Sequence, residues 1–160
     1  MNHDIPIVIR PMQSRDVPVV TQIAKMVMPY SWSESIFQDC LQGDYQAWVM
    51  QQGSLDIANA VLGFIVSLVQ VGEGQILKVA IRQRVQGQGY GRQLVEHALT
   101  KMQQDINRIF LEVRISNSQA LAFYQSLGFK AVGQRRDYYR TDDGREDAVI
   151  MEKVIEHQTN

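Results

Sequence analysis

The segment from Gln86 to Arg92 carries three glycines, Gly87, Gly89 and Gly91, between a predicted strand and a predicted helix. Glycines let backbone N–H groups approach an anion closely, and the amino end of a helix adds favourable partial positive charge. We therefore predict that a phosphate-bearing ligand binds here. The segment is not a P-loop, because no Gly-Lys step precedes a Ser or Thr. It is not a Rossmann dinucleotide-binding fingerprint either, because Arg92 stands where the third glycine is required. The remaining pattern is Gln-x-x-Gly-x-Gly, although such glycines also serve backbone geometry alone.

A carboxylate stands in an otherwise apolar strand, since Glu112 lies between Leu111 and Val113. A carboxylate in such surroundings has to be paired, solvated through a cleft or functionally tuned. Two interpretations stay open. Glu112 is a proton acceptor, or it forms a structural salt bridge with Arg114, which shares its strand face at a spacing of two.

Two further polar residues follow that strand. Asn117 comes just before a predicted helix, where its side chain can cap the helix or contact a ligand. Tyr124 comes two helical turns later, near the same helical face. An ordinary core tyrosine with a satisfied hydroxyl is the alternative for Tyr124.

Hydrophobic periodicity and turn residues predict the elements that position these groups. Strands are expected at Ile7–Ile9, Trp48–Met50, Val61–Val69, Gln75–Ile81, Ile109–Val113, Phe129–Tyr139 and Ala148–Lys153. Helices are expected at Val17–Val27, Glu34–Leu41 with Ser33 as a possible cap, Gly91–Met102 and Ser118–Leu127. Gly72, Glu73 and Gly74 are expected to form a hairpin turn. The order predicts an α/β fold with one mixed sheet, helices on both of its faces, and a single domain over residues 1–160.

Composition narrows the class of protein. The chain has 160 residues, of which 45% are hydrophobic, and this suits one sizeable core. Its 16 basic and 17 acidic residues give a net charge of -1, so a direct nucleic-acid partner is not expected. The lone Cys40 cannot form an internal disulfide and is expected in the core. No run of 18 apolar residues and no signal peptide is found, so we expect a cytoplasmic protein without a membrane partner.

The chain resembles the GNAT superfamily of N-acetyltransferases in several motifs that occur in the same order. These are Gln86–Gly91, Leu111–Arg114, Ser116-Asn117 and Ala122–Phe129, and the early segments Ile9–Met12 and Tyr30–Phe37 extend the resemblance over nearly the whole chain. The blocks Arg135–Tyr139 and Gly144–Ala148, with Met151, resemble the RimI-type N-terminal acetyltransferases. The resemblance implies a GNAT-type fold, with a central mixed sheet between helices.

The resemblance also implies acetyl-coenzyme A as co-substrate and a role for each motif. The phosphate cradle would consist of Gly87, Gln88, Gly89, Tyr90, Gly91 and Arg92. The pantetheine would bond to the backbone of Val79, Ala80 and Ile81. Asn117 would contact the coenzyme. Glu112 would accept a proton from the attacking amine, and Tyr124 would donate one to the departing thiolate. Direct attack needs neither a metal nor a covalent acetyl-cysteine. Ile81-Arg82-Gln83 departs from the acidic residue and proline that relatives often carry after this strand.

The implied acceptor is the N-terminal α-amine of an alanine in a small-subunit ribosomal protein, bound by a monomer or weak dimer in the cytoplasm. Trp32, Tyr138 and Tyr139 would contact this peptide. Two alternatives remain. The first is a lysine or small-amine acetyltransferase, and acetylation at lysine of a peptide whose α-amine is blocked would indicate it. The second is a non-catalytic acyl-coenzyme A binding or regulatory module, which would bind the coenzyme without transfer.

Overall fold

Strands and helices follow one another in the order that the sequence predicts. A computed structural model describes residues 5–53 and 60–157. Its strands are β1 (Ile7–Pro11), β2 (Tyr45–Gln52), β3 (Val61–Gln70), β4 (Gly72–Ile81), β5 (Ile106–Arg114), β6 (Lys130–Thr141) and β7 (Gly144–Val154). Its helices are α1 (Val17–Val27), α2 (Glu34–Asp39), α4 (Tyr90–Met102) and α5 (Ser118–Ser126), with short 3₁₀ turns at Ser14–Asp16, Gln83–Val85 and Gln103–Asp105. The predicted cap of α2 is confirmed, because the Ser33 hydroxyl accepts a hydrogen bond from the Ile36 N–H.

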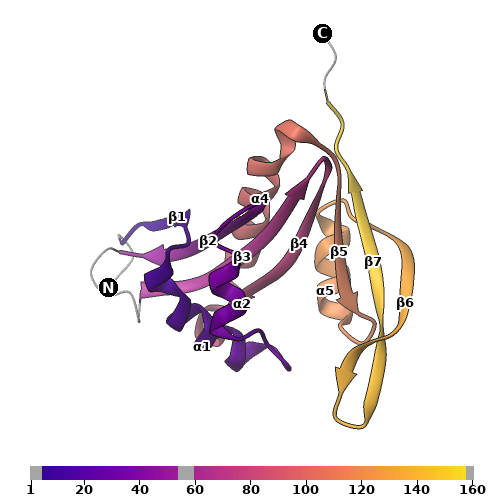
Figure 1. The fold of residues 1–160 in the computed structure, drawn as a ribbon, viewed down its shortest axis with the longest axis horizontal. Helices are drawn as coiled ribbons and strands as arrows, with labels where there is room; N and C mark the ends of the chain where they lie inside the picture. Colours follow the sequence, from indigo (N-terminus) through magenta and orange to yellow (C-terminus); the bar gives the residue numbers. More distant parts are fainter. Residues whose placement is uncertain (1–4, 54–59, 158–160) are drawn as a thin grey trace.

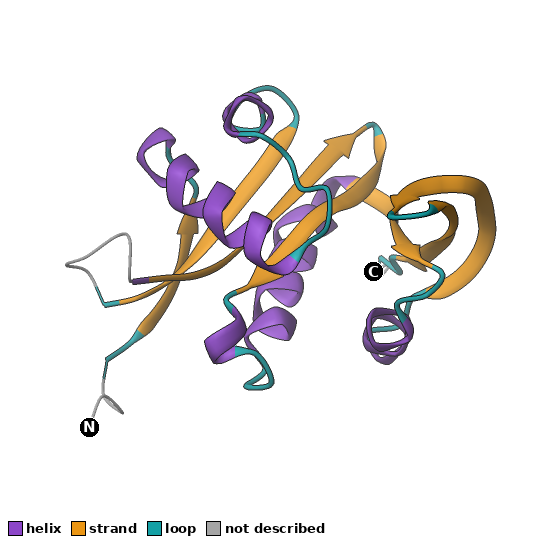
Figure 2. Cartoon of the chain, turned by 90° about the horizontal axis from the view of Figure 1, so that it is seen from below, coloured by secondary structure: helices purple, strands orange, loops and turns teal. Residues whose placement is uncertain are grey.

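The described strands form one mixed sheet of seven in the order β1-β2-β3-β4-β5-β7-β6 (Figure 1). Neighbouring strands in it are antiparallel except β4 and β5, which run parallel. Helices cover both faces of this sheet, as predicted (Figure 2). The predicted α/β class and the predicted mixed sheet are therefore confirmed.

Each face of the sheet has its own hydrophobic core. Helices α1 and α2 bury Val20, Ile23 and Phe37 against one face, and Cys40 lies in this core as expected. On the other face, α4 buries an amphipathic stripe and α5 adds Tyr124. The stripe contains Leu94, Val95, Ala98, Leu99 and Met102, spaced as a helix that packs on a sheet requires.

Strands β4 and β5 pair over only part of their length. Their register runs from Gly72 opposite Ile106 to Gln75 opposite Phe110 and ends there. Beyond this point the two ribbons diverge (Figure 1). The β4 edge from Ile76 to Ile81 therefore lacks a described strand partner on the side of β5, and its backbone N–H and C=O groups remain available there.

The turn between β3 and β4 is shorter than predicted. Glu73 and Gly74 belong to β4, where they pair with Gln70 and Val69, so their assignment to the turn was wrong. Gly72 alone supplies the left-handed backbone that the turn needs, with φ at 76°. Gly74 serves packing instead, because a Cβ atom at this position would lie 2.9 Å from the Met102 sulfur.

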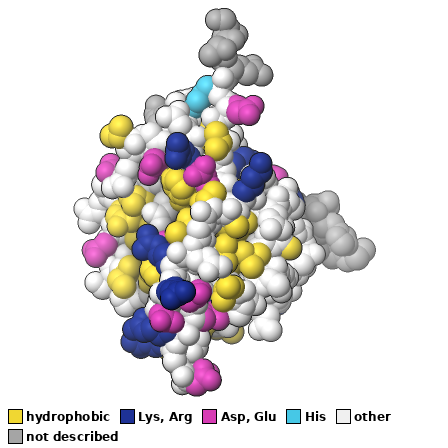
Figure 3. Space-filling model, turned by 90° about the vertical axis from the view of Figure 1, so that its right-hand side faces the viewer, with side chains coloured by type: hydrophobic (Ala, Val, Ile, Leu, Met, Phe, Trp, Pro, Cys, Tyr) yellow, Lys and Arg dark blue, Asp and Glu magenta, His cyan; other side chains and the backbone are white. Residues whose placement is uncertain are grey.

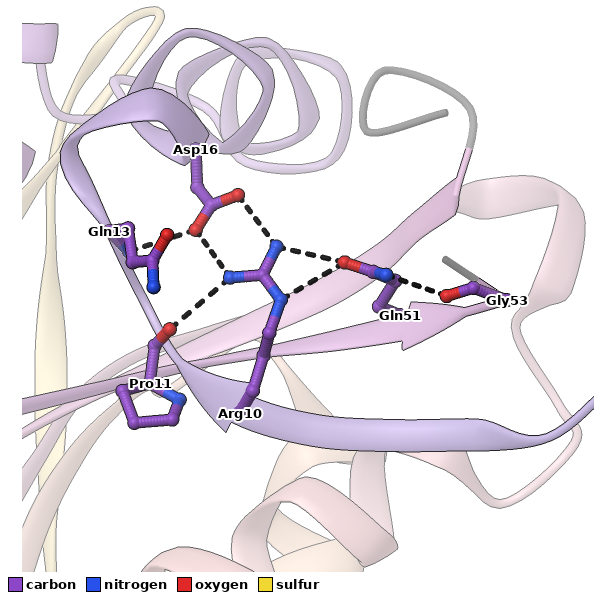
Figure 4. A network of polar contacts seen from close by, with 6 residues as sticks. All are labelled: Arg10, Pro11, Gln13, Asp16, Gln51 and Gly53. Atoms are coloured by element: carbon purple, nitrogen blue, oxygen red, sulfur yellow. Dashed lines mark hydrogen bonds and ion pairs between the residues drawn. The ribbon is translucent and has the colours of Figure 1, made fainter. Parts of the chain in front are cut away.

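A buried ion pair ties β1 to the segment that leads into α1 (Figure 4). The Arg10 guanidinium donates to both carboxylate oxygens of Asp16, at 2.7 and 2.8 Å, and to Oε1 of Gln51 on β2. Burial alone would raise the pKa of Asp16, but the hydrogen bonds from Arg10 and from the Gln13 N–H, with the Arg10 charge, hold this pKa below its usual value. This ion pair was not predicted from the sequence.

Replacing Asp16 with alanine is expected to lower the free energy of unfolding by about 3–5 kcal/mol, because it leaves a partly buried guanidinium without its carboxylate. The carboxylate stabilises the fold above the unfolded-state pKa of about 4, and this contribution is lost as pH falls through the lower folded-state pKa. Urea unfolding at neutral pH and near pH 3 should therefore show a smaller difference between the two proteins in acid. Asp39→Ala, at an exposed carboxylate, is the control, and an equal loss in both variants would contradict the role of Asp16.

Candidate active site

Two cavities meet where β4 and β5 diverge. The first, of about 580 Å³, is lined by the glycine segment and is called the loop cavity below. The second, of about 430 Å³, contains Glu112 and is called the carboxylate cavity. Six residues line both: Val27, Met28, Val79, Asn117, Ala120 and Tyr124. A ligand that enters the loop cavity can thus reach a second ligand in the carboxylate cavity at this junction.

The glycine segment forms the turn that leads from β4 into α4. Gly89 immediately precedes the helix with φ at 85°, and Gly87 has φ at 81°, so both adopt a left-handed backbone that glycine favours. Neither has another heavy atom within 4 Å of the position of a Cβ. The first N–H groups of α4 lack partners within the helix, and together with its dipole they favour an anion. These features fit the predicted phosphate cradle.

The structure gathers most of the predicted cradle around one cavity. Gly87, Gly89, Tyr90, Gly91 and Arg92 line the loop cavity together with Val79, Ala80, Ile81 and Asn117. Gln88 does not line it. The Arg92 guanidinium donates to the Ser126 hydroxyl at 2.8 Å, which ties the start of α4 to α5.

Gln86 and Arg82 fix the end of β4 beside this cavity. The Gln86 side-chain amide donates to the Ile81 carbonyl at 2.9 Å, so the first residue of the Gln-x-x-Gly-x-Gly motif closes its own turn. Arg82 donates to Val61 and Leu62 carbonyls on β3 at 2.6 and 2.8 Å, from its side chain and backbone respectively. Arg82 thus anchors the connection in which this chain departs from the family pattern.

Glu112 points into the carboxylate cavity, and its ion-pair partner is Arg135. Its Oε1 lies 3.0 Å from Nε of Arg135 on β6, while its side chain is 13% exposed. Arg114 pairs instead with Glu146 on β7, at 3.1 Å. The proposed salt bridge between Glu112 and Arg114 was therefore wrong.

An irregularity in β6 brings Arg135, Tyr138 and Tyr139 to Glu112. The register between β6 and β7 shifts between Arg135 and Tyr139, and Asp137 there has a left-handed φ of 50°. The Asp137 N–H donates to Oδ1 of Asp147 at 2.9 Å, which holds this bulge. The predicted peptide contacts Tyr138 and Tyr139 both line the carboxylate cavity.

Both tyrosines of this bulge contact Glu112. A hydrogen bond with the Glu112 carboxylate raises the pKa of Tyr138. The Tyr139 hydroxyl donates to the Glu112 backbone carbonyl at 3.2 Å, and burial followed by the nearby negative charge raises the pKa of Tyr139 to about 12. Both phenols therefore keep their protons at neutral pH and can act as hydrogen-bond donors.

Asn117 and Tyr124 lie at the junction of the two cavities, as their spacing suggested. The Asn117 carbonyl oxygen accepts from the Ala120 N–H at 3.0 Å and caps α5, so its amide NH₂ remains for a ligand. Tyr124 is only 7% exposed and packs edge-on against Phe123 and Phe129. Burial raises the pKa of Tyr124, and its hydroxyl stays protonated at neutral pH.

Trp32 lines neither cavity, although it was predicted to contact the substrate. Its ring packs against Phe37 at a centroid distance of 5.4 Å, within the core formed with α1 and α2. The ammonium of Lys78 also lies over this ring, 5.2 Å from its centroid. Trp32 therefore supports a residue of the carboxylate cavity, and its direct contact with substrate stays a prediction.

Charged side chains of both signs lie on the side of the molecule formed by the β6–β7 hairpin (Figure 3). Basic and acidic side chains lie close together over the face formed by β6 and β7, with hydrophobic side chains between them (Figure 3). At the end of this hairpin the Tyr30 hydroxyl donates to Oδ1 of Asp142 at 2.9 Å, which joins the segment after α1 to the β6–β7 turn. Arg140 lies over the Tyr30 ring at 5.5 Å.

Two contributors to the site were missed from the sequence. Arg135 was noted only as part of a C-terminal block, and Lys78 was read as one residue of a strand. An arginine or lysine within a strand is usually solvent-facing, so no local signal marked either residue.

No cluster of three or more possible metal ligands occurs within residues 5–53 and 60–157. Among the described helices, none has both the length and the apolar character that a membrane span requires.

The arrangement can join a phosphate-bearing donor to an acceptor that loses a proton. The donor would occupy the loop cavity, Glu112 would face the acceptor, and the Tyr124 hydroxyl stands between them. The chain belongs to the acetyltransferase (GNAT) family, whose pattern matches residues 17–129.

Within the GNAT family, the chain is similar to acetyltransferases that are named for a ribosomal protein. The chain is 33% identical to the ribosomal protein bS18-alanine N-acetyltransferase of Escherichia coli (strain K12) over 141 residues, 88% of this chain and 92% of that protein. It is 30% identical to the putative ribosomal protein bS18-alanine N-acetyltransferase of Bacillus subtilis (strain 168) over 89% of this chain and 92% of that protein. The crystal structure of the ribosomal-protein-S18-alanine N-acetyltransferase from Escherichia coli has a TM-score of 0.87 and 32% identity, with 96% of this chain and 97% of that chain covered.

Proposed function

We propose that this chain transfers the acetyl group of acetyl-coenzyme A to the α-amine of the N-terminal alanine of ribosomal protein bS18. The observation that carries the proposal is the junction of the loop cavity and the carboxylate cavity at Val79, Asn117 and Tyr124. A thioester at this junction faces Glu112 on one side and the glycine segment on the other. The choice of acceptor rests on the relatives, which are named for bS18-alanine acetylation.

The coenzyme would lie along the loop cavity. Its pyrophosphate would accept hydrogen bonds from the N–H groups of Gly87 to Arg92, at the amino end of α4. Its pantetheine would bond to the open edge of β4 at Val79, Ala80 and Ile81, where β5 has moved away. The free NH₂ of Asn117 would contact the coenzyme near the junction.

Glu112 would make the acceptor nucleophilic. An α-ammonium has a reference pKa of about 8, so most of the substrate is protonated near neutral pH and cannot attack. Glu112 would take this proton, directly or through one water, and general-base catalysis typically contributes about 10²- to 10⁴-fold. The neutral amine would then attack the thioester carbonyl carbon in a ternary complex. Arg135 and Tyr138 would hold the Glu112 carboxylate in place.

Tyr124 would complete the reaction by giving its proton to the departing thiolate. The thiol that results has a reference pKa of roughly 8.5, below the reference value of about 10 for tyrosine, so this transfer is uphill in water. Burial raises the pKa of Tyr124 further. The same apolar junction raises the pKa of a buried thiol, which offsets part of the difference.

The proposed function also includes a single domain, a cytoplasmic location and a monomer or weak dimer. Residues 1–160 would form one acetyltransferase domain, supported by a single sheet that runs through the described residues. With a ribosomal protein as acceptor, the reaction would take place in the cytoplasm. The net charge of -1 supports contact with protein over direct contact with nucleic acid or membrane. A monomer or weak dimer would suffice, because the described residues of one chain line both cavities.

A pair of peptides tests the proposal against lysine acetylation. One peptide carries the first residues of bS18 with a free α-amine, and the other is identical except that its α-amine is blocked. Mass spectrometry should find acetyl transfer to the first peptide and little to the second. Equal transfer to lysine in both peptides would make the chain a lysine acetyltransferase. Coenzyme binding without transfer would favour the non-catalytic module.

The cradle predicts a loss of coenzyme affinity when Gly89 becomes valine. A β-branched residue in a left-handed backbone costs roughly 1–2 kcal/mol, so the turn will rearrange and displace its N–H groups. We expect acetyl-coenzyme A to bind about tenfold more weakly or worse by calorimetry. Gly43→Val is the matched control, because Gly43 also has a left-handed φ and open space but lines neither cavity. Equal affinity in the two folded variants would remove Gly89 from the cradle.

A further inference from the structure

Lys78 is an amine inside the carboxylate cavity for which the proposed reaction has no use. A register shift between β3 and β4 leaves Leu77 without an opposite residue, so Leu77 forms a bulge. Lys78 consequently lies opposite Val66, on the face covered by α1 and α2, whereas regular alternation would place it on the face of Ile76. The bulge thus directs the lysine into the cavity that also contains Glu112 and Tyr124.

The amine of Lys78 shares the carboxylate cavity with Glu112, Arg114 and Arg140, but it lies against an aromatic ring. Its ammonium lies over the Trp32 ring at 5.2 Å, and within residues 5–53 and 60–157 no carboxylate forms an ion pair with it. Lys78 lines the carboxylate cavity together with Val79, Asn117 and Tyr124, which belong to the junction where the thioester would lie. A flexible four-carbon side chain at this position can turn from Trp32 toward the junction.

We propose that Lys78 is itself an acetyl acceptor, and that the chain acetylates this side chain when acetyl-coenzyme A is bound and no peptide fills the carboxylate cavity. The proposal rests on the proposed function in one respect, since it requires acetyl-coenzyme A in the loop cavity. It adds a modification site on this chain to the reaction on a separate peptide.

The chemistry is the same acyl transfer with a different amine. The neutral Nζ of Lys78 attacks the thioester carbonyl carbon, so that a C–N bond forms as the C–S bond breaks. The nitrogen loses a proton to Glu112 or to water, and the thiolate of coenzyme A takes a proton from Tyr124. The products are Nε-acetyl-lysine at position 78 and free coenzyme A, and no further reactant is needed.

The electrostatics of the cavity favour the reactive form of this amine. Burial, followed by the charge of Arg114, lowers the pKa of Lys78. A larger fraction of this lysine is therefore neutral near physiological pH than of a lysine side chain in water. Attack within a folded chain also avoids the entropic cost of bringing two molecules together.

Acetylation of Lys78 would change the acceptor side of the site. It removes a positive charge and the cation–π contact with Trp32, and it adds an acetyl group to the space that a peptide would occupy. Peptide acetylation should therefore fall in proportion to the fraction of chains acetylated at Lys78. A bound acceptor peptide should in turn protect the lysine.

The test follows acetylation of the full chain incubated with acetyl-coenzyme A alone. Peptide-mapping mass spectrometry compares Lys78 with Lys101, which also lies over a tryptophan, with Nζ 5.8 Å from the Trp48 centroid. We expect Lys78 to react about tenfold faster or more, at a rate independent of protein concentration, and Tyr124→Phe to slow Lys78 alone. Lys78→Arg keeps the charge but cannot be acetylated, so its peptide activity should not decline on preincubation. Lys101→Arg should decline like the unmodified sequence.

Each combination of results decides between the claims. A chain that acetylates the bS18 peptide but leaves Lys78 no more modified than Lys101 overturns the self-acetylation alone. Acetylation at Lys78 without transfer to any peptide overturns the proposed peptide substrate and supports Lys78 as the acceptor. Absence of both reactions, with acetyl-coenzyme A present, overturns both proposals.

Discussion

Replacing Glu112 with glutamine is expected to slow acetyl transfer at neutral pH by about two orders of magnitude or more. Glutamine keeps the shape of the side chain but cannot accept the proton of the α-ammonium. Raising the pH toward the amine pKa of about 8 should restore part of the activity, because the substrate then arrives already deprotonated. Coenzyme affinity should not change, since Glu112 lines the carboxylate cavity and not the loop cavity.

Glu146→Gln is the matched control for this variant. Glu146 is also a half-buried glutamate paired with an arginine, with a side chain 18% exposed against 13% for Glu112, but it lines neither cavity. Loss of either ion pair can lower the melting temperature. If Glu112 only supports Arg135, both variants will melt earlier, and the pH–rate profile of the surviving protein will match that of the unmodified chain. Measuring both properties on one preparation separates these roles.

Tyr124→Phe should lower turnover by about 10²-fold while leaving coenzyme affinity unchanged, because only the proton donor to the thiolate is removed. The ring remains to pack against Phe123 and Phe129, so the fold should persist. Single-turnover kinetics with the bS18 peptide and calorimetry with acetyl-coenzyme A give the two quantities. A thioester with a more acidic leaving thiol should depend less on the Tyr124 hydroxyl.

The control for this variant is Tyr45→Phe, which removes a hydroxyl from an exposed position that lines neither cavity. Full activity in Tyr45→Phe together with a slow Tyr124→Phe is the expected pair of results. If Tyr124→Phe turns over as fast as the unmodified chain, Tyr124 is a packing residue and the thiolate takes its proton from water.

Local patterns were enough to predict most of the fold. The stripe from Leu94 to Met102 predicted α4 and its buried face, because helical periodicity depends only on neighbouring turns. The turn at Gly72 was placed too broadly, since two glycines in one segment do not reveal which of them takes a left-handed backbone. Gly74 is needed instead for its close packing against Met102. That contact joins β4 to α4, and a local sequence pattern does not reveal it.

The residues of the site also fall into those that local signals predicted and those that depend on the arrangement of distant elements. Glycines at a strand-to-helix turn and a glutamate in an apolar strand are local signals, and both predicted residues that line the cavities. The partner of Glu112 could not be predicted, because it depends on the strand order β5-β7-β6 and on the bulge that brings Arg135 across. The position of the Lys78 side chain in the carboxylate cavity likewise depends on a one-residue bulge at Leu77. This bulge changes the strand face of every residue that follows it.

The identity of the acetylated atom tests the central claim most directly. Unacetylated full-length bS18 should be incubated with this chain and acetyl-coenzyme A, and fragment mass spectrometry should then locate the acetyl group. We predict one acetyl group per bS18 molecule, on the α-amine of the N-terminal alanine, and its loss in parallel reactions with Glu112→Gln at neutral pH. Acetylation on lysine side chains of bS18, or none at all by a folded chain that binds the coenzyme, would contradict the proposed function.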